Sequence, residues 1–388
     1  MKKICVFTGA RSEYGLLKPL MDEIASDKDM LLQIIASGMH LSPEFGLTYK
    51  EIEKDGLEIN EKIEILLSSD TPVGISKSIG LGLISFSESL QRLKPDMAVI
   101  LGDRFEALAF AIACYVSLVP IAHLYGGETT EGAFDEGFRH SITKMSFLHF
   151  TAIDDYRKRV IQLGESPDRV FNVGALGIDN IKKMRLLSKK DLEQKLNLKF
   201  KEHNLLITFH PVTLEEKVSR KQFAELLKAV DELKDTMLIF TKANADAEGR
   251  RINSLIDEYT AKNKDKGAVF DSMGQSLYLS AMQYVDAVVG NSSSGIIEAP
   301  SFNIGTINIG DRQRGRVKSD SVIDCKPYFL DIKKAFEVLY SEEFQKQLKT
   351  AVNPYGNGTA AKKIKSIIKS YKIDDKKKQF YDIGIKKI

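Results

Sequence analysis

The sequence predicts an α/β protein of two domains, each a doubly wound parallel sheet covered by helices. Three observations support this prediction. Apolar strand-like runs alternate with amphipathic segments from the first residues onward, so the hydrophobic period switches between two and 3.6. This pattern pauses in a polar, lysine-rich stretch at 182–201 and then restarts. The length of 388 residues suits two domains with separate cores.

The first domain is assigned to residues 1–180. Its predicted strands cover residues 4–7, 31–36, 97–101, 119–124, 148–152 and 170–173. Its predicted helices cover residues 16–24, 75–93, 105–118, 138–145 and a segment that ends at Leu163.

The second domain is assigned to residues 181–359, with helices between its strands. Its predicted strands cover residues 205–208, 237–240, 268–270, 287–289 and 306–309. In the C-terminal region, 360–388, a helix at 360–371 is expected to pack back onto the first domain. The charge-rich tail from residue 372 is expected to be a solvated helix or coil.

Composition and charge exclude several classes of protein. A net charge of +3, without a Lys/Arg run interleaved with aromatic residues, argues against nucleic-acid binding. Three cysteines without a CxxC signal neither a disulfide framework nor a thiolate metal site. The most apolar stretch, 107–125, contains Pro120 and His123, so we interpret it as a buried helix and strand rather than a membrane span. With no signal-peptide layout, a cytoplasmic location is expected.

A metal site is not expected either. His123, His140 and His149 are interpreted as lacking the i, i+4 spacing with an acid that metal-binding helices show. Lys144, Arg157 and Arg159 are interpreted as solvated side chains.

Polar residues follow the predicted strands, at the edge where open α/β sheets bind ligands. Two such edges, one from each domain, predict a polar cleft between the domains. The residues that follow the strands are Gly9 to Glu13, Gly38 to His40, Gly102 to Arg104, Gly126 to Glu128, His210 and Pro211, Lys242 to Asp246, Gly290 to Gly295 and Gly310 to Arg312.

The segment 288–300 is the strongest candidate for an anion site. An apolar strand stops at Gly290, a serine-rich turn follows, and a helix begins. Unpaired N–H groups at a helix start attract anions, small side chains permit close approach, and serine hydroxyls add donors. Glu298 stands where it would accept hydrogen bonds from a sugar. The alternative is an ordinary serine N-cap.

The other candidates also have structural alternatives. Asp103 suits a helix N-cap, and Glu131, Asp135 and Glu136 would favour the N-terminus of the helix that carries Arg139. His210 would suit a hydrogen-bonded strand end.

Taken together, arginines and a serine-rich turn suit a diphosphate, and carboxylates in the first half suit proton transfer. No GxGxxG follows the first strand and no GxxxxGK[ST] occurs, which disfavours NAD chemistry and P-loop phosphoryl transfer.

The chain resembles the hydrolysing UDP-N-acetylglucosamine 2-epimerases of sialic acid synthesis and their relatives that act on N,N'-diacetylbacillosamine nucleotides towards legionaminic acid. The matching motifs run in order along nearly the whole chain, so the match is highly specific. They are residues 8–14 (TGARSEY), 37–40 (SGMH), 101–106 (LGDRFE), 126–128 (GGE), 135–144 (DEGFRHSITK), 209–213 (FHPVT), 290–295 (GNSSSG) and 309–313 (IGDRQ).

The resemblance implies a GT-B fold, two Rossmann-like domains with parallel sheets facing across a cleft, and a nucleotide held mainly by the second. It implies catalysis by Asp103 and Asp135, with Glu128, Glu136 and Arg139 beside them. It also implies a UDP-sugar partner, a homodimer or homotetramer, and no cofactor or metal. The implied substrate-binding residues are Arg11, His40, Arg104, His210, Asn244, Met273, Ser292, Ser293, Glu298 and Arg312.

One position departs from the family pattern. Some members have a catalytic glutamate before Gly-Gly-Glu, where this chain has Tyr125. Either that acid is dispensable, or Glu128, Glu131 or Glu136 replaces it, or the sugar differs.

The implied reaction converts UDP-N-acetylglucosamine and water to N-acetylmannosamine and UDP through a 2-acetamidoglucal. The alternatives are the same reaction on UDP- or GDP-N,N'-diacetylbacillosamine, a GT-B glycosyltransferase, and a nucleotide-sugar binding protein without catalysis.

Overall fold

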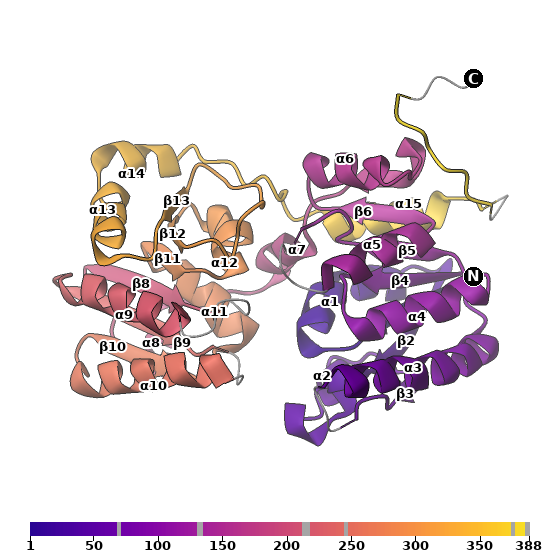
Figure 1. The fold of residues 1–388 in the computed structure, drawn as a ribbon, viewed down its shortest axis with the longest axis horizontal. Helices are drawn as coiled ribbons and strands as arrows, with labels where there is room; N and C mark the ends of the chain where they lie inside the picture. Colours follow the sequence, from indigo (N-terminus) through magenta and orange to yellow (C-terminus); the bar gives the residue numbers. More distant parts are fainter. Residues whose placement is uncertain (68–70, 130–134, 212–217, 244–246, 374–376, 385–388) are drawn as a thin grey trace. The chain divides into compact units, whose positions relative to one another are not determined.

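The computed structural model describes residues 1–67, 71–129, 135–211, 218–243, 247–373 and 377–384. The chain folds into two compact units, each built around its own parallel sheet (Figure 1). Unit 1 comprises Met1–Asn180 and Tyr355–Ile388, and unit 2 comprises Ile181–Pro354.

The sheet of unit 1 has seven strands in the order β3-β2-β1-β4-β5-β6-β7, and every paired neighbour is parallel. The strands are β1 Lys2–Thr8, β2 Met30–Ser37, β3 Glu61–Ile63, β4 Met97–Leu101, β5 Ile121–Leu124, β6 Leu148–Thr151 and β7 Val170–Asn172. Strand β3 was not predicted, because three residues with only Ile63 buried carry too little periodicity to identify an edge strand.

Helices cover both faces of this sheet. They are α1 Arg11–Ala25, α2 Tyr49–Lys54, α3 Pro72–Leu93, α4 Phe105–Val116, α5 Asp135–Met145, α6 Asp154–Gln162, α7 Leu176–Lys183 and α15 Ala360–Ser370, with short 3₁₀ turns at Gly38–Leu41, Pro43–Phe45 and Pro167–Arg169. Alternate residues of β1 face two separate cores. Ile4 and Val6 pack with α1 and α15, whereas Cys5 and Phe7 pack with α3 and α4.

The sheet of unit 2 has six parallel strands in the order β10-β9-β8-β11-β12-β13. The strands are β8 His203–Thr208, β9 Thr236–Thr241, β10 Gly267–Phe270, β11 Ala287–Gly290, β12 Gly305–Ile309 and β13 Val322–Cys325. Each sheet thus contains the Rossmann strand order 3-2-1-4-5-6. The predicted fold class, two doubly wound parallel sheets, is confirmed, whereas edge strand β13 was not predicted.

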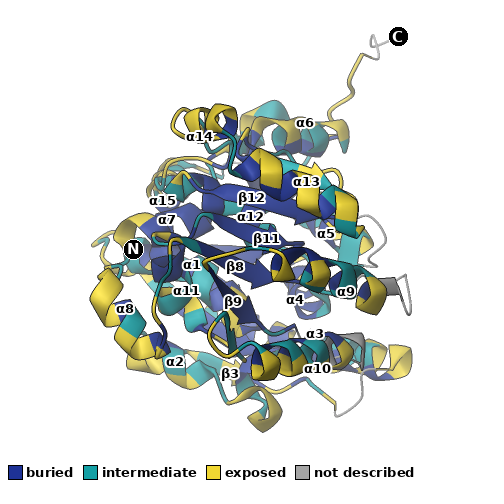
Figure 2. Cartoon of the chain, turned by 90° about the vertical axis from the view of Figure 1, so that its left-hand side faces the viewer, coloured by how far each residue is buried: buried dark blue, intermediate teal, exposed yellow. Residues whose placement is uncertain are grey.

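Helices cover the sheet of unit 2, and most of them carry exposed residues. They are α8 Lys189–Leu196, α9 Val218–Asp231, α10 Ala247–Lys262, α11 Gly274–Met282, α12 Ser293–Ile297, α13 Phe329–Leu339 and α14 Glu342–Leu348, with a 3₁₀ turn at Ala299–Phe302. In Figure 2 the strands β8, β11 and β12 are buried, while α9, α10 and α13 carry exposed residues on their outer sides. This unit therefore has its own core, as an independent sheet requires.

Two helix boundaries differ from the predictions for local reasons. Helix α3 begins at Pro72 rather than residue 75, because Thr71 caps it by accepting from the Gly74 N–H and proline suits the first helical position. The lysine-rich stretch 182–201 contains helix α8, which buries Leu192 and Leu196.

The apolar stretch 107–125 forms most of α4 and all of β5, and its interpretation as core holds except at residues 115–118, which are exposed. Among the residues that the structure describes, no helix combines the length and apolar character needed to cross a bilayer.

The chain returns to unit 1 after unit 2. Helix α15, yellow in Figure 1, packs against α1 through Ala361, Ile364 and Ile368. The carboxylate of Asp179 accepts the backbone N–H groups of Ala360 and Ala361 at 3.0 and 2.9 Å, which satisfies two donors at the start of α15. The return of the chain is therefore held by apolar packing and by a side-chain cap.

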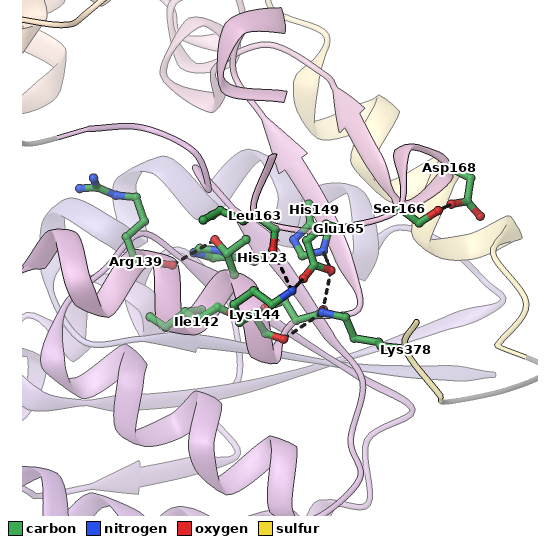
Figure 3. Close-up of polar contacts among 12 residues, drawn as sticks. His123, Arg139, Ile142, Lys144, His149, Leu163, Glu165, Ser166, Asp168 and Lys378 are labelled. Carbon is green, nitrogen blue, oxygen red and sulfur yellow. Dashed lines mark hydrogen bonds and ion pairs between the residues drawn. The ribbon is translucent and has the colours of Figure 1, made fainter. Parts of the chain in front are cut away.

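The described residues of the tail beyond α15 are mostly exposed coil, as predicted, but Lys378 is partly buried. Lys378 Nζ forms an ion pair with Glu165 Oε2 at 2.6 Å and donates to the carbonyls of Lys144 and Ser146 at the end of α5 (Figure 3). Lys144 was interpreted as solvated, but its Nζ lies 2.6 Å from Glu165 Oε1. The tail thus supplies a cation to a carboxylate that is only 1% exposed.

The Glu165 carboxylate also contacts His149 Nε2 at 3.0 Å. Burial favours the neutral acid, but hydrogen bonds from His149, Lys144 and Lys378 outweigh it and lower the pKa of Glu165 to about 2. Because the pKa of Glu165 is lower in the folded than in the unfolded chain, its ionised carboxylate stabilises the fold at pH values above its usual pKa of about 4.5. This contribution disappears as the pH falls from about 4.5 towards 2.

Replacement of Lys378 by methionine is expected to lower the free energy of unfolding at pH 7 by about 1–3 kcal/mol, because Glu165 loses a buried charged donor. Thermal or urea unfolding at pH 7 and pH 3 measures this. The loss should shrink at pH 3, where protonation of Glu165 begins to remove the pair. Lys372→Met is the control, since Lys372 is exposed. Equal stability of the two variants at pH 7 would contradict the proposed role of the tail.

Candidate active site

At the carboxyl edge of the sheet of unit 1, Arg139 hydrogen-bonds to several of the predicted catalytic residues. Its side chain, from helix α5, is 6% exposed. Its Nη2 donates to Asp103 Oδ2, and its Nη1 donates to Glu136 Oε2 at 2.7 Å and to the Glu128 carbonyl at 2.9 Å. Charge-assisted hydrogen bonds of this kind fix carboxylate positions. The fold therefore brings together residues that lie up to 36 positions apart in the sequence.

Asp135, at the first position of α5, shares the electrostatic environment of this group. Burial raises its pKa, and the negative charge of Asp103 raises it further, while Arg104 and Arg139 oppose the shift. When two neighbouring carboxyl groups have different pKa values, one can stay protonated and act as an acid while the other stays ionised and acts as a base. Burial and the charge of Asp103 thus both favour the protonated form of Asp135.

Arg104 is held in a defined direction by two acids. Its Nη2 and Nε donate to Glu106 Oε1 and Oε2 at 2.7 and 3.1 Å, and its Nε lies 3.8 Å from Glu13 Oε1. Glu106 is completely buried. Burial raises the pKa of Glu13 to about 7, although Arg104 and the Gly9 N–H, 2.6 Å away, oppose this. Sequence reasoning did not assign a role to Glu13 or Glu106.

The turn that presents Asp103 is also supported from below. Gly102 has φ +76°, a conformation that favours glycine. The buried ring of His123 lies beneath it, with Nε2 2.8 Å from the Gly102 carbonyl. Burial lowers the pKa of His123 to about 3, so the ring is neutral at pH 7 and its Nε2–H donates to that carbonyl. A histidine inside an apolar strand was the signal in the sequence for this support.

Arg11 and His40, two of the predicted substrate-binding residues, differ in exposure. Arg11 has an exposed side chain that pairs with Glu51 at 3.0 Å. His40 is fully buried, and its Nε2 and Nδ1 lie 2.9 and 2.8 Å from the hydroxyls of Thr8 and Thr48. In this structure both ring nitrogens of His40 have threonine partners, one of them at the end of β1.

Two interpretations of basic residues in unit 1 were wrong. His140 does lie four residues after an acid, and its Nε2 is 3.1 Å from Glu136 Oε1. Arg159 is not simply solvated, because it donates to the Gly127 carbonyl, and Arg157 donates to the Val170 carbonyl at 2.9 Å. Among the described residues, no group of three or more His, Cys, Asp or Glu side chains is placed to hold a metal ion.

Tyr125 has φ +65°, which is unusual for a residue with a side chain. Its side chain packs against the core between the sheet, α1 and α15. The backbone N–H donates to the Phe150 carbonyl at 3.0 Å, so the strained turn is anchored to β6. At this position the chain therefore has a partly buried ring that packs against the core.

In unit 2 the serine-rich turn is followed by a short helix, as the sequence predicted. Helix α12 spans only Ser293–Ile297 and is capped by Ser292, whose hydroxyl accepts from the Ser294 N–H. The ordinary N-cap is thus present. Five residues make only a small dipole, so donors from the turn and from Arg312 would have to supply most of the attraction for an anion.

The remaining candidates of unit 2 differ in exposure. Burial raises the pKa of Glu298 to about 7, with Arg316 opposing. Ser293 and His210 are partly exposed, Arg312 is exposed, and Met273 is 6% exposed. Asn244 and Glu131 lie outside the described residues.

Gly290 makes the turn possible. It has φ +132°, and a Cβ there would lie 2.0 Å from the Thr208 carbonyl oxygen in the neighbouring strand. Backbone cannot move aside as a flexible side chain would. Gly290→Ala is therefore expected to lower the free energy of unfolding by clearly more than about 1 kcal/mol. Urea unfolding checks this, with Gly310→Ala as the control, since that glycine has positive φ but no atom near the added Cβ. A smaller effect at Gly290 than at Gly310 would contradict the steric argument.

Comparison with known proteins assigns the family. Residues 22–369 match the family described as UDP-N-acetylglucosamine 2-epimerase, which is most of the chain. The chain belongs to the UDP-N-acetylglucosamine 2-epimerase family. The resemblance inferred from the sequence motifs is thereby confirmed.

Three relatives of this epimerase chain cover most of its length. It is 50% identical over 344 residues to a GDP/UDP-N,N'-diacetylbacillosamine 2-epimerase (hydrolyzing) of Campylobacter jejuni, with 89% of each chain covered. It is 37% identical to the polysialic acid biosynthesis protein P7 of Escherichia coli, covering 99% and 98%. It is 32% identical to a UDP-N,N'-diacetylbacillosamine 2-epimerase (hydrolyzing) of Legionella pneumophila, covering 95% and 96%.

Solved epimerase structures share the fold. A UDP co-structure of Staphylococcus aureus MnaA has a TM-score of 0.77 at 20% identity and covers 99% of this chain and 100% of its own. A UDP-N-acetylglucosamine 2-epimerase of Neisseria meningitidis bound to UDP-N-acetylglucosamine has a TM-score of 0.75 at 18% identity, covering 96% and 100%. At these identities the likeness extends to the fold alone.

Proposed function

We propose that this epimerase-family protein is a hydrolysing nucleotide-sugar 2-epimerase. With water, it would convert a nucleoside-diphosphate 2-acetamido sugar to the free manno-configured sugar and a nucleoside diphosphate. The single observation that carries the proposal is the 50% identity, over 89% of both chains, to a hydrolysing 2-epimerase. The carboxyl pair Asp103 and Asp135, in one electrostatic environment, supports the same chemistry.

The proposed substrate is UDP- or GDP-N,N'-diacetylbacillosamine, since the names of two relatives specify diacetylbacillosamine. The free product would be 2,4-diacetamido-2,4,6-trideoxymannose. UDP-N-acetylglucosamine is the second candidate, because the family that matches residues 22–369 is described by that substrate.

In the proposed mechanism, the bond between C1 and the diphosphate oxygen breaks while a carboxylate takes the proton from C2. The electrons of the C2–H bond form the C1=C2 bond of a glycal, and the diphosphate leaves with the bonding pair. Water then adds at C1 while a proton returns to C2 on the opposite face. The steps need proton-transfer groups and stabilisation of the leaving diphosphate.

In unit 1, Asp103 and Asp135 would exchange protons with the sugar, and Arg139 would hold Asp103 in place. Arg104, directed by Glu106, would contact the diphosphate. In unit 2, His210, Ser292, Ser293 and Arg312 would bind the nucleoside diphosphate.

Incubation of the purified protein with each of the three nucleotide sugars in D₂O tests this proposal. We expect a free sugar with deuterium at C2, detected by NMR, and one nucleoside diphosphate for each sugar released. Retention of the original hydrogen at C2 would exclude proton abstraction. Sugar transfer only when an acceptor is added would indicate a glycosyltransferase, and binding without release would indicate a non-catalytic protein.

A further inference from the structure

Asn291 connects three strand ends of unit 2 although it was given no role from the sequence. It follows β11, and its side chain is almost fully buried. Its side-chain Oδ1 accepts from the His210 N–H at 2.7 Å, and its Nδ2 donates to the His210 carbonyl at 2.8 Å. The backbone N–H and the carbonyl of His210 are therefore both hydrogen-bonded to the side-chain amide of Asn291.

The backbone of Asn291 adds the other connections. Its N–H donates to the Thr208 carbonyl at 3.2 Å, at the end of β8. Its carbonyl accepts from Arg312 Nη1 at 3.1 Å and Gln313 Nε2 at 2.9 Å, in the turn after β12. The strands β8, β11 and β12 are neighbours in the sheet, so this one residue spans the edge that they share.

The chemistry of the contact to His210 requires a primary amide. It needs one acceptor and one donor at the end of a short side chain, and asparagine supplies both. An aspartate anion supplies acceptors only, so it would face the His210 carbonyl without a proton between them. A protonated aspartic acid has the same shape as the amide, with an O–H in place of the N–H₂, and it would restore both bonds.

We propose that Asn291 is a positioning residue that orients His210 for binding of a nucleoside diphosphate at this edge. The inference rests on the proposed function, from which the diphosphate-binding role of His210 comes. Asn291 itself does not need to touch the ligand. Its side chain acts through His210, whereas the contact to Arg312 involves only its backbone and survives substitution.

The test measures UDP binding by calorimetry between pH 5 and pH 8, with each variant expressed as a ratio to wild type at the same pH. We expect Asn291→Ala to weaken binding by about 10-fold at every pH, because both hydrogen bonds are lost. We expect Asn291→Asp to be weakened similarly at pH 8 and to recover towards wild type at pH 5. A loss for Asn291→Asp that is constant across the pH range would overturn the proposal.

Asn353→Asp is the matched control. Asn353 Nδ2 also donates to backbone and side-chain acceptors in unit 2, the Ile297 carbonyl at 2.8 Å and Ser301 Oγ at 2.7 Å. Because these two acceptors lie in α12 and in the turn that follows it, the ratio of UDP binding by Asn353→Asp to that by wild type should stay near one at all pH values. A pH-dependent loss at Asn353→Asp equal to that at Asn291→Asp would also overturn the proposal.

A double substitution provides a readout that general loss of structure would not reproduce. If Asn291 acts through the His210 ring, Asn291→Ala should weaken UDP binding no further in a His210→Ala background. Additive losses would overturn the inference. Failure of the wild-type protein to bind UDP would instead refute the proposed function, and the inference with it. Wild-type binding with unaltered binding by both Asn291 variants would refute the inference alone.

Discussion

Replacement of Asp103 or Asp135 by asparagine is expected to lower kcat by about 10²–10⁴-fold, the range that positioned proton-transfer groups contribute. UDP affinity should stay within a few-fold of wild type. The two side chains share one environment in unit 1, where Asp103 is bound by Arg139 and the Asp103 charge helps to raise the pKa of Asp135. Turnover is measured by release of the nucleoside diphosphate, and affinity by calorimetry.

The pH dependence of the remaining activity separates the two roles. If Asp135 donates a proton, activity falls as pH rises through its pKa, and a raised pKa places that fall at higher pH. Asp103→Asn removes a negative neighbour, so the pKa of Asp135 should decrease and the fall should move to lower pH. If the fall in activity stayed at the same pH in Asp103→Asn, this result would argue against an effect of the Asp103 charge on the pKa of Asp135.

Asp154→Asn serves as the control for these substitutions. Asp154 is an exposed carboxylate of unit 1 that pairs with Lys158 at 3.0 Å on helix α6. Its replacement should change neither kcat nor UDP affinity. If Asp103→Asn and Asp135→Asn weakened UDP binding as much as turnover, these residues would be ligand-binding groups rather than proton-transfer groups.

Replacement of Arg312 by alanine is expected to weaken UDP binding by about 2–5 kcal/mol, the loss typical when one partner of a desolvated charge pair is removed. Arg312 uses Nη1 to donate to the Asn291 carbonyl at 3.1 Å. A guanidinium has five donors, so one such bond orients the group and leaves others for a diphosphate. Arg312→Lys should recover only part of the affinity, because an ammonium cannot bind two oxygens in the same planar way.

Arg314→Ala is the control for Arg312. It lies two residues further along the same turn and is exposed like Arg312, but it is Arg312 that donates to the Asn291 carbonyl at the end of β11. Removal of Arg314 should leave UDP affinity within about two-fold, as expected for an exposed charge that does not pair with the ligand. Unchanged affinity in Arg312→Ala would refute the assignment of this residue to the nucleotide site.

The site was only partly predictable from the sequence. Asp103, Arg104 and His210 were identifiable because each directly follows an apolar strand, where parallel sheets present ligand-binding residues. The partners that direct them were not. Glu106 beneath Arg104 and Asn291 beside His210 hold their neighbours through contacts that depend on how separate strand ends meet. A linear pattern records the end of a strand but not its neighbours.

The C-terminal tail is a second case in which the sequence pattern did not reveal a tertiary contact. Its lysines resembled those of any solvated segment, and hydrophobic periodicity does not reveal that Lys378 pairs with a buried carboxylate more than two hundred residues away. Residues 61–63 and 322–325 were also missed, because short edge strands bury too few side chains to produce a period of two.

By itself, the sequence determined the class of fold, since apolar periodicity follows directly from which side of each element faces a core. Its ordered motifs also determined the epimerase family. Tertiary structure alone decided that the buried His40 ring meets two threonine hydroxyls, that Tyr125 packs against the core, and that Glu106 and Asn291 hydrogen-bond to Arg104 and His210. The physical reason is that burial and hydrogen-bond partners are properties of neighbouring chain segments, and these become neighbours only when the sheets form.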